Sequence, residues 1–202
     1  MKISVYSARG GHRENIRHKR RQLLLLCLIL IGVITGAVLV YLLEDVDSLI
    51  RLRFTQNIFK KSRSITFFQQ FKRSLLPLMG LLGIEFFAGS FAFGQVVVSI
   101  TVLIRGVASG LSAAAVYLLQ GFEGMPTLLL SVLPLSLGGA LLLLIGGGEA
   151  WQSANRIAAF CFTPSEASHS RDVRLYSVKF AFMAAAAALI CLIDTAVIYW
   201  VL

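Results

Sequence analysis

The sequence predicts an all-α membrane protein, a polytopic bundle of about five transmembrane helices with a cytoplasmic N-terminus and an extracytoplasmic C-terminus. Of its 202 residues, 57% are hydrophobic and only 14% are charged, and the mean hydropathy is +0.79. A soluble domain carries about a quarter charged residues, so this chain has too few polar groups to cover a soluble fold. The charged residues also lie mostly outside the apolar runs. This composition argues against a soluble enzyme and predicts a multi-pass protein of the bacterial cytoplasmic membrane, in contact with the lipid bilayer.

The first transmembrane helix is predicted at residues 23–43, after a basic cytoplasmic tail at residues 1–22. The run has 21 residues without a charge. At about 1.5 Å per residue it reaches roughly 31 Å, the thickness of the hydrocarbon core. Basic flanks stay in the cytoplasm, and a five-crossing arrangement with the N-terminus inside leaves 12 of the 19 Lys and Arg inside. The basic tail is explained as a topology signal, and we expect no nucleic-acid partner.

Residues 75–147 are predicted to form three crossings, with one turn whose position has two alternatives. A turn near residues 105–106 keeps Arg105 in the cytoplasmic interface but leaves a short helix, whereas a turn near 94–95 balances the helix lengths and buries Arg105. Burial of an arginine costs on the order of 3 kcal/mol and length mismatch costs fractions of a kcal/mol per Å, so the two penalties are comparable. A second turn is predicted at residues 121–126.

The glycine run Gly146-Gly147-Gly148 is predicted to end the helix that follows this second turn, at residues 127–145. Residues 148–177 are mixed in polarity and are predicted to be a cytoplasmic or interfacial segment. The last transmembrane helix is predicted at residues 178–202, with Tyr199 and Trp200 at its outer end.

The extracytoplasmic loop at residues 44–74 is predicted to contain a basic amphipathic helix. Apolar residues recur in it at helical spacing with basic residues between them. Such a helix either rests on the outer leaflet or docks a partner protein. The candidate docking residues are Arg53, Lys60, Lys61 and Arg63.

Two acidic residues, Glu85 and Asp194, lie well inside apolar runs. A carboxylate in hydrocarbon is expensive, so both are candidate functional residues facing the bundle interior, where they could share a polar pocket with Ser90 or Thr195. The alternative is that they fix helix packing or reach the interface, and this alternative is favoured because two acids without a lysine or histidine make no ion path.

Small residues in the predicted spans mark candidate surfaces for close helix packing. Gly106 and Gly110 form a GxxxG motif, and Gly138 and Gly139 lie in the middle of the fourth predicted span. In lipid, helices associate through such surfaces, either within the chain or in an oligomer.

No motif for catalysis, cofactor binding or metal binding is recognised. The chain has no Walker A loop, HExxH or GxSxG sequence, and its three histidines are not at metal-ligand spacing. The sequence therefore predicts a protein that is not an enzyme and uses no cofactor or metal.

Four short segments in the middle of the chain resemble the stage II sporulation protein M family. They are Leu81-Leu-Gly-Ile84, Val102-Leu-Ile-Arg105-Gly-Val-Ala-Ser-Gly110, Gly121-Phe-Glu-Gly124 and Leu130-Ser-Val-Leu-Pro134. The layout of the chain, with a basic N-terminus, a first span, a basic outer loop and a hydrophobic bundle, is also similar. The resemblance implies a non-enzymatic membrane scaffold for sporulation engulfment, which anchors peptidoglycan hydrolases at the septal, mother-cell membrane.

A permease-like membrane subunit of a transporter is the competing interpretation. It would use Glu85 and Asp194 along a transport path, or pair with a cytoplasmic ATPase through residues 149–177.

Overall fold

The computed structural model describes residues 4–42, 66–124, 133–162 and 169–201. Within these ranges the chain is helical and has no strand, which confirms the predicted all-α class. The elements are α1 (Ser4–Leu42), α4 (Phe67–Ala88), α5 (Gly94–Gln120), the 3-10 turn η1 (Gly121–Gly124), α7 (Leu133–Phe162) and α8 (His169–Val201).

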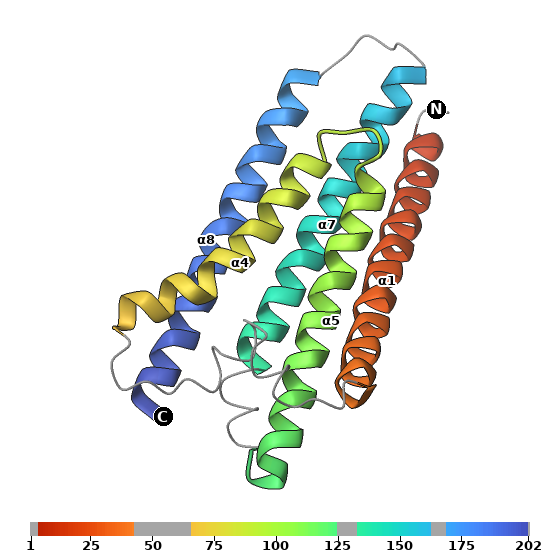
Figure 1. The fold of residues 1–202 in the computed structure, drawn as a ribbon. Coiled ribbons are helices and arrows are strands. Elements are labelled where there is room, and N and C mark those ends of the chain that lie inside the picture. The colour runs from red at the N-terminus through yellow and green to blue at the C-terminus, as the bar shows by residue number, and fades with distance from the viewer. Residues whose placement is uncertain (1–3, 43–65, 125–132, 163–168, 202) are drawn as a thin grey trace.

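The five helices form one bundle in which successive helices run in opposite directions (Figure 1). The N-terminal end of α1, the turn between α4 and α5, and the ends of α7 and α8 that lead toward one another all lie at one end. The C-terminal end of α8 and the turn after α5 lie at the other. We call these the N-end and the C-end of the bundle.

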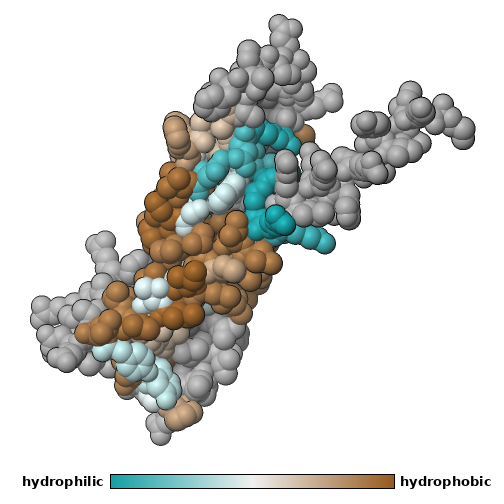
Figure 2. Space-filling model, turned by 90° about the vertical axis from the view of Figure 1, so that its right-hand side faces the viewer, coloured by the Kyte–Doolittle hydropathy of each residue, from teal (hydrophilic) through white to brown (hydrophobic). Residues whose placement is uncertain are grey.

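Three helical stretches are long and apolar enough to cross a membrane, as judged over the described residues. They are Lys19–Leu42 in α1, Gly94–Leu118 in α5 and Arg174–Val197 in α8. Large apolar side chains such as Leu42, Leu76 and Phe182 are more than 70% exposed on the outside of the bundle. The face seen in Figure 2 carries an apolar band across its middle with hydrophilic residues gathered above it. Such a surface is typical of a protein surrounded by lipid.

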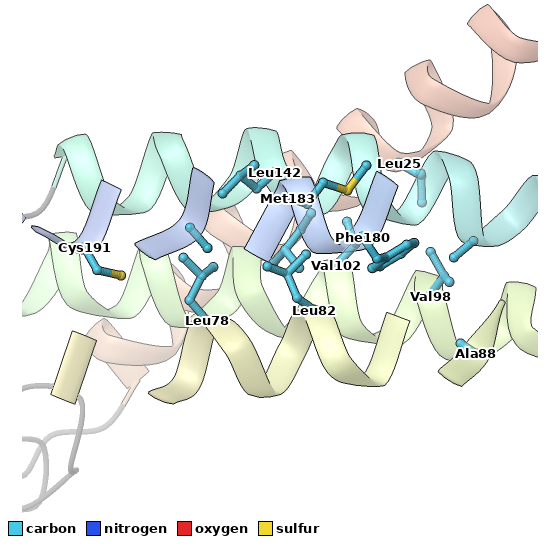
Figure 3. Packing of buried hydrophobic residues seen from close by; sticks show 13 residues of the cluster. Leu25, Leu78, Leu82, Ala88, Val98, Val102, Leu142, Phe180, Met183 and Cys191 are labelled. Carbon is cyan, nitrogen blue, oxygen red and sulfur yellow. The ribbon is translucent and has the colours of Figure 1, made fainter. Parts of the chain in front are cut away.

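The buried core lies between α4, α5, α7 and α8, with α1 contributing Leu25 (Figure 3). Leu78 and Leu82 of α4 point toward Leu142 of α7 and Met183 of α8. Close packing in the interior of the bundle fixes how the helices are aligned with one another. The polar residues described below therefore have defined neighbours.

The chain turns between α4 and α5 at residues 89–93. This turn lies immediately before residues 94–95, where one of the two alternatives from the sequence placed it. The turn is closed by hydrogen bonds from Gly89 N to Glu85 O (3.0 Å) and from Gly94 N to Phe91 O (3.0 Å). α5 then continues without interruption through residues 105–106, so the alternative turn there is wrong and Arg105 lies inside a helix. The 3-10 turn that follows α5 starts at Gly121, whose φ of 58° is favourable for glycine.

α7 does not end at Gly146-Gly147-Gly148, which corrects the predicted helix stop. The helix runs to Phe162, and most of the segment predicted to be cytoplasmic or interfacial (residues 148–177) belongs to α7 and α8. Gly146 and Gly147 serve close contact instead, whereas a Cβ at Gly148 would meet nothing within 4 Å. A Cβ at Gly146 would lie 2.7 Å from Glu85 Oε2, and one at Gly147 would lie 2.9 Å from Val98 Cγ1. Gly146 and Gly147 of α7 therefore mark close helix contact and not a helix end.

Candidate functional site

The GxxxG motif of α5 packs against a second GxxxG motif, Gly32 and Gly36 of α1. A Cβ at Gly106 would lie 2.5 Å from Ile29 O of α1, and a Cβ at Gly32 would lie 2.6 Å from Leu103 O of α5. The added Cβ would also collide with backbone at Gly36 and Gly110. The main chains of α1 and α5 are thus in close contact at all four glycines, and Gly106 and Gly110 pack within the chain.

Gly138 and Gly139 lie side by side in α7 but meet different partners. A Cβ at Gly138 would lie 3.1 Å from the side chain of Ile190 in α8. A Cβ at Gly139 would lie 2.7 Å from Nη2 of Arg105 and 3.2 Å from Leu78 Cδ1. Gly138 therefore serves helix packing, whereas Gly139 makes room for a guanidinium group.

Arg105 is held within the bundle by a main-chain carbonyl. Its Nη2 donates a hydrogen bond to Leu135 O in the first turn of α7 at 3.0 Å, while its buried Nε has no hydrogen-bond partner among the described residues. The lack of a side chain at Gly139 lets the guanidinium reach this carbonyl. A charge-assisted bond offsets part of the cost of removing the arginine from water.

Asp194 lies near the C-end of α8 and is 2% exposed. Its Oδ2 accepts a hydrogen bond from Ser74 Oγ of α4 at 3.3 Å, and its buried Oδ1 has no partner in the described ranges. Thr195 Oγ1 donates to Cys191 O of the same helix at 2.7 Å, which satisfies the hydroxyl locally. Asp194 thus joins α4 to α8 through one side-chain bond.

Glu85 lies in the last turn of α4 and is fully buried. Neither carboxylate oxygen has a hydrogen-bond partner in the part of the chain that the structure describes. The carboxylate lies against Gly146 and Gly147 of α7, where the two missing side chains leave room for it. On its main-chain side, the Tyr176 hydroxyl of α8 donates to Phe86 O at 2.9 Å and contacts Glu85 O at 3.3 Å.

Glu85 and Asp194 do not share a pocket, which corrects the pocket expected from the sequence. Asp194 pairs with Ser74, which precedes Glu85 by 11 residues in α4. Eleven residues of helix span about 16 Å, so the two acids belong to opposite ends of the bundle. Ser90, the other expected member, is exposed in the turn after α4.

Polar contacts at the N-end connect α5, α7 and α8. Gln95 Nε2 of α5 donates to Asn155 Oδ1 of α7. Lys179 of α8 forms an exposed ion pair with Glu149 of α7 at 2.8 Å. These contacts join α5 to α7 and α7 to α8, and an exposed ion pair of this kind contributes little to stability.

The candidate docking residues Arg53, Lys60, Lys61 and Arg63 lie outside the described residues. Over the described ranges, no group of three or more His, Cys, Asp or Glu is placed to hold a metal ion.

Three features of the site were missed in the sequence. Gly32 and Gly36 have the same GxxxG spacing as Gly106 and Gly110, and this signal could have found them. Ser74 carries no signal, because a serine at the edge of an apolar run is common. Arg105 was identified, but its partner Leu135 O is a main-chain atom that no sequence pattern reveals.

The chain was compared with models of known protein families, with curated proteins and with solved structures, and no match was found in any of the three comparisons.

Proposed function

We propose that this chain is a cell-membrane protein with five crossings, a cytoplasmic N-terminus and an extracytoplasmic C-terminus, acting as a non-enzymatic scaffold. The alternating directions of the five helices and three apolar stretches support the crossings. The excess of Lys and Arg in the segments on the same side of the membrane as the N-terminus supports the orientation.

One observation favours a scaffold over a transport path. Each charged group inside the bundle has its own neighbours: Asp194 bonds to Ser74, Arg105 bonds to Leu135 O, and Glu85 lies about 16 Å from Ser74 along α4. A transporter needs its polar groups to follow one another along a path. Here Asp194 and Arg105 each join two helices, whereas Glu85 has no side-chain partner in the described ranges, so the three groups form no chain of hydrogen bonds there.

The finer assignment is a scaffold of a sporulation engulfment complex that anchors peptidoglycan hydrolases at the septal membrane. It rests on the resemblance of roughly residues 75–150 to the stage II sporulation protein M family, and on the similar layout of the rest of the chain. The partners would bind the extracytoplasmic side, through the basic residues Arg53, Lys60, Lys61 and Arg63.

Purification of the tagged chain from sporulating cells tests this assignment. We expect peptidoglycan hydrolases to copurify, and we expect this to be lost when the four docking residues are replaced by glutamine. Replacement of Arg171 and Arg174, which belong to the predicted cytoplasmic side, is the matched control and should leave the complex intact. Imaging of the same tagged chain in sporulating cells is a second test. A uniform distribution over the whole membrane throughout engulfment, with no enrichment at the septum, would contradict the assignment.

A permease-like subunit is the second candidate, favoured by the unpartnered carboxylate of Glu85. Transport into vesicles, or ATPase activity of a bound partner, that disappears in Glu85→Gln or Asp194→Asn would establish it. Retention of hydrolase binding in the same two variants is expected of the scaffold.

A further inference from the structure

An open groove lies along one face of α4, toward the C-end of the bundle. It has a volume of about 470 Å³ and is lined by Lys72, Leu75, Leu76, Met79 and Gly80. These positions recur at the three- and four-residue spacing of a single helix face. Pro77 lies within this stretch, and α4 is visibly bent in its N-terminal half (Figure 1). A proline inside a helix removes a main-chain hydrogen bond and kinks the axis, which makes one face concave.

The groove is polar at one end and apolar along the rest. Lys72 lies at the start of the groove, stacked over the Phe68 ring with its Nζ 4.6 Å from the ring centroid. The other four lining residues are apolar or glycine, and none of the five is acidic. Gly80 leaves open space in the groove, because a Cβ at this position would meet nothing within 4 Å.

We propose that this groove binds an anionic phospholipid, with its phosphate on Lys72 and one acyl chain along Leu75, Leu76, Met79 and Gly80. The stretch from Lys72 to Gly80 is about 12 Å long, which matches much of one acyl chain in one leaflet. Lys72 lies three residues before the apolar part of α4 begins at Leu75, so its ammonium group is at the level of the headgroups. The site depends on α4 crossing the membrane but not on the scaffold role.

Charge argues against a second copy of this chain as the occupant. In a two-fold symmetric dimer through this face, each Lys72 would face the other Lys72, and the described lining residues of the groove include no acid to neutralise them. An anionic headgroup is complementary to the single positive charge.

Native mass spectrometry of the full-length protein tests the proposal. The detergent-solubilised protein is mixed with equimolar phosphatidylglycerol and phosphatidylcholine, and the lipids that remain bound are counted. We expect a preference for phosphatidylglycerol of about five-fold, the ratio expected of one lysine near a headgroup. Equal retention of the two lipids would overturn the proposal.

Four variants separate the headgroup contact from the acyl-chain contact. Lys72→Gln should abolish the preference, whereas Arg73→Gln, at the neighbouring exposed position outside the groove, should preserve it. Gly80→Leu should fill the groove and remove the bound lipid. Gly83→Leu is its control, because Gly83 also has open space around its Cβ but does not line the groove. Unchanged unfolding temperatures would show that all four variants fold.

Two results would count against a lipid site even if the groove is occupied. If the preference for phosphatidylglycerol persists in Lys72→Gln, Lys72 does not bind the headgroup. Loss of a copurifying protein in Gly80→Leu, with the bound lipid unchanged, would assign the groove to a protein helix. Failure of hydrolase copurification leaves the lipid proposal standing, since the two experiments have different readouts.

Discussion

Glu85 and Asp194 are both buried carboxylates, but their surroundings differ at the level of single atoms. Asp194 accepts a hydrogen bond from Ser74, whereas neither oxygen of Glu85 has a partner in the described ranges. A buried polar group without a partner costs about 1–3 kcal/mol. Both buried oxygens of Glu85 lack a partner in the described ranges and only one of Asp194 does, so burial of Glu85 is expected to cost more.

Replacement of Glu85 by leucine is expected to stabilise the protein, by about 1–3 kcal/mol, because it removes an unpaired buried acid and keeps most of the volume. Asp194→Leu is the comparison and should be less favourable, since it leaves the Ser74 hydroxyl without its partner. Thermal unfolding of the purified variants in one detergent measures both. A lower unfolding temperature for Glu85→Leu than for the parent would show that the acid has a partner or role in the native state.

The burial of Arg105 illustrates what the sequence predicts about a single residue and what it does not. The sequence placed an arginine in an apolar run and left its burial undecided, because the two opposing penalties are comparable. The balance is decided by Leu135 O and by the space at Gly139, both of which belong to a helix 30 or more residues away. Such compensation depends on tertiary contact and is not encoded in the local pattern.

Among the helices, α1 and α5 make the closest contact through two GxxxG motifs. Main-chain atoms, which cannot rotate away as a side chain can, oppose a Cβ at all four glycines. Overpacking of this kind typically costs about 1–3 kcal/mol and occasionally more.

We therefore expect Gly36→Val or Gly110→Val to destabilise the protein by about 3 kcal/mol, since the two helices would have to separate. Gly83→Val is the control, because open space surrounds that position and only helix propensity changes. Unfolding temperatures of the three variants provide the measurement. Equal losses in all three would mean that the glycines act through propensity and not through contact.

Helix existence followed from the sequence more reliably than helix ends did. The apolar runs predicted helices, and the described residues confirm an all-helical fold. The end predicted at Gly146-Gly147-Gly148 was wrong because glycine both terminates helices and permits close approach. Which effect operates depends on the facing residue, here Glu85 and Val98, and a single sequence does not show which residues face each other.

For the whole molecule, the alternation of helix directions gives a topology that chemistry can test. Ser90, exposed in the turn after α4, belongs to the predicted cytoplasmic end, and Phe122, exposed in the turn after α5, belongs to the opposite end. In a background with Cys27, Cys161 and Cys191 replaced by serine, we expect a membrane-impermeant thiol reagent to label Phe122→Cys in intact protoplasts. Ser90→Cys should react only after permeabilisation.

The reverse labelling pattern would invert the orientation, and labelling of both sites from outside would rule out a single crossing by α5 between them. A C-terminal reporter gives an independent check, since a reporter active only in the cytoplasm would contradict five crossings.

The pairing of α1 with α5 also has a consequence for biogenesis. Gly110 is synthesised about 70 residues after the end of α1, which at roughly 5–20 residues per second corresponds to about 4–14 s. During this interval Gly32 and Gly36 face lipid, translocon or chaperone and not the helix that they fit. α1 is therefore synthesised before its glycine partner, and α4, made in between, does not supply that partner. A mutation that speeds translation or stalls it before residue 110 would therefore change how long this glycine surface is exposed to other membrane proteins.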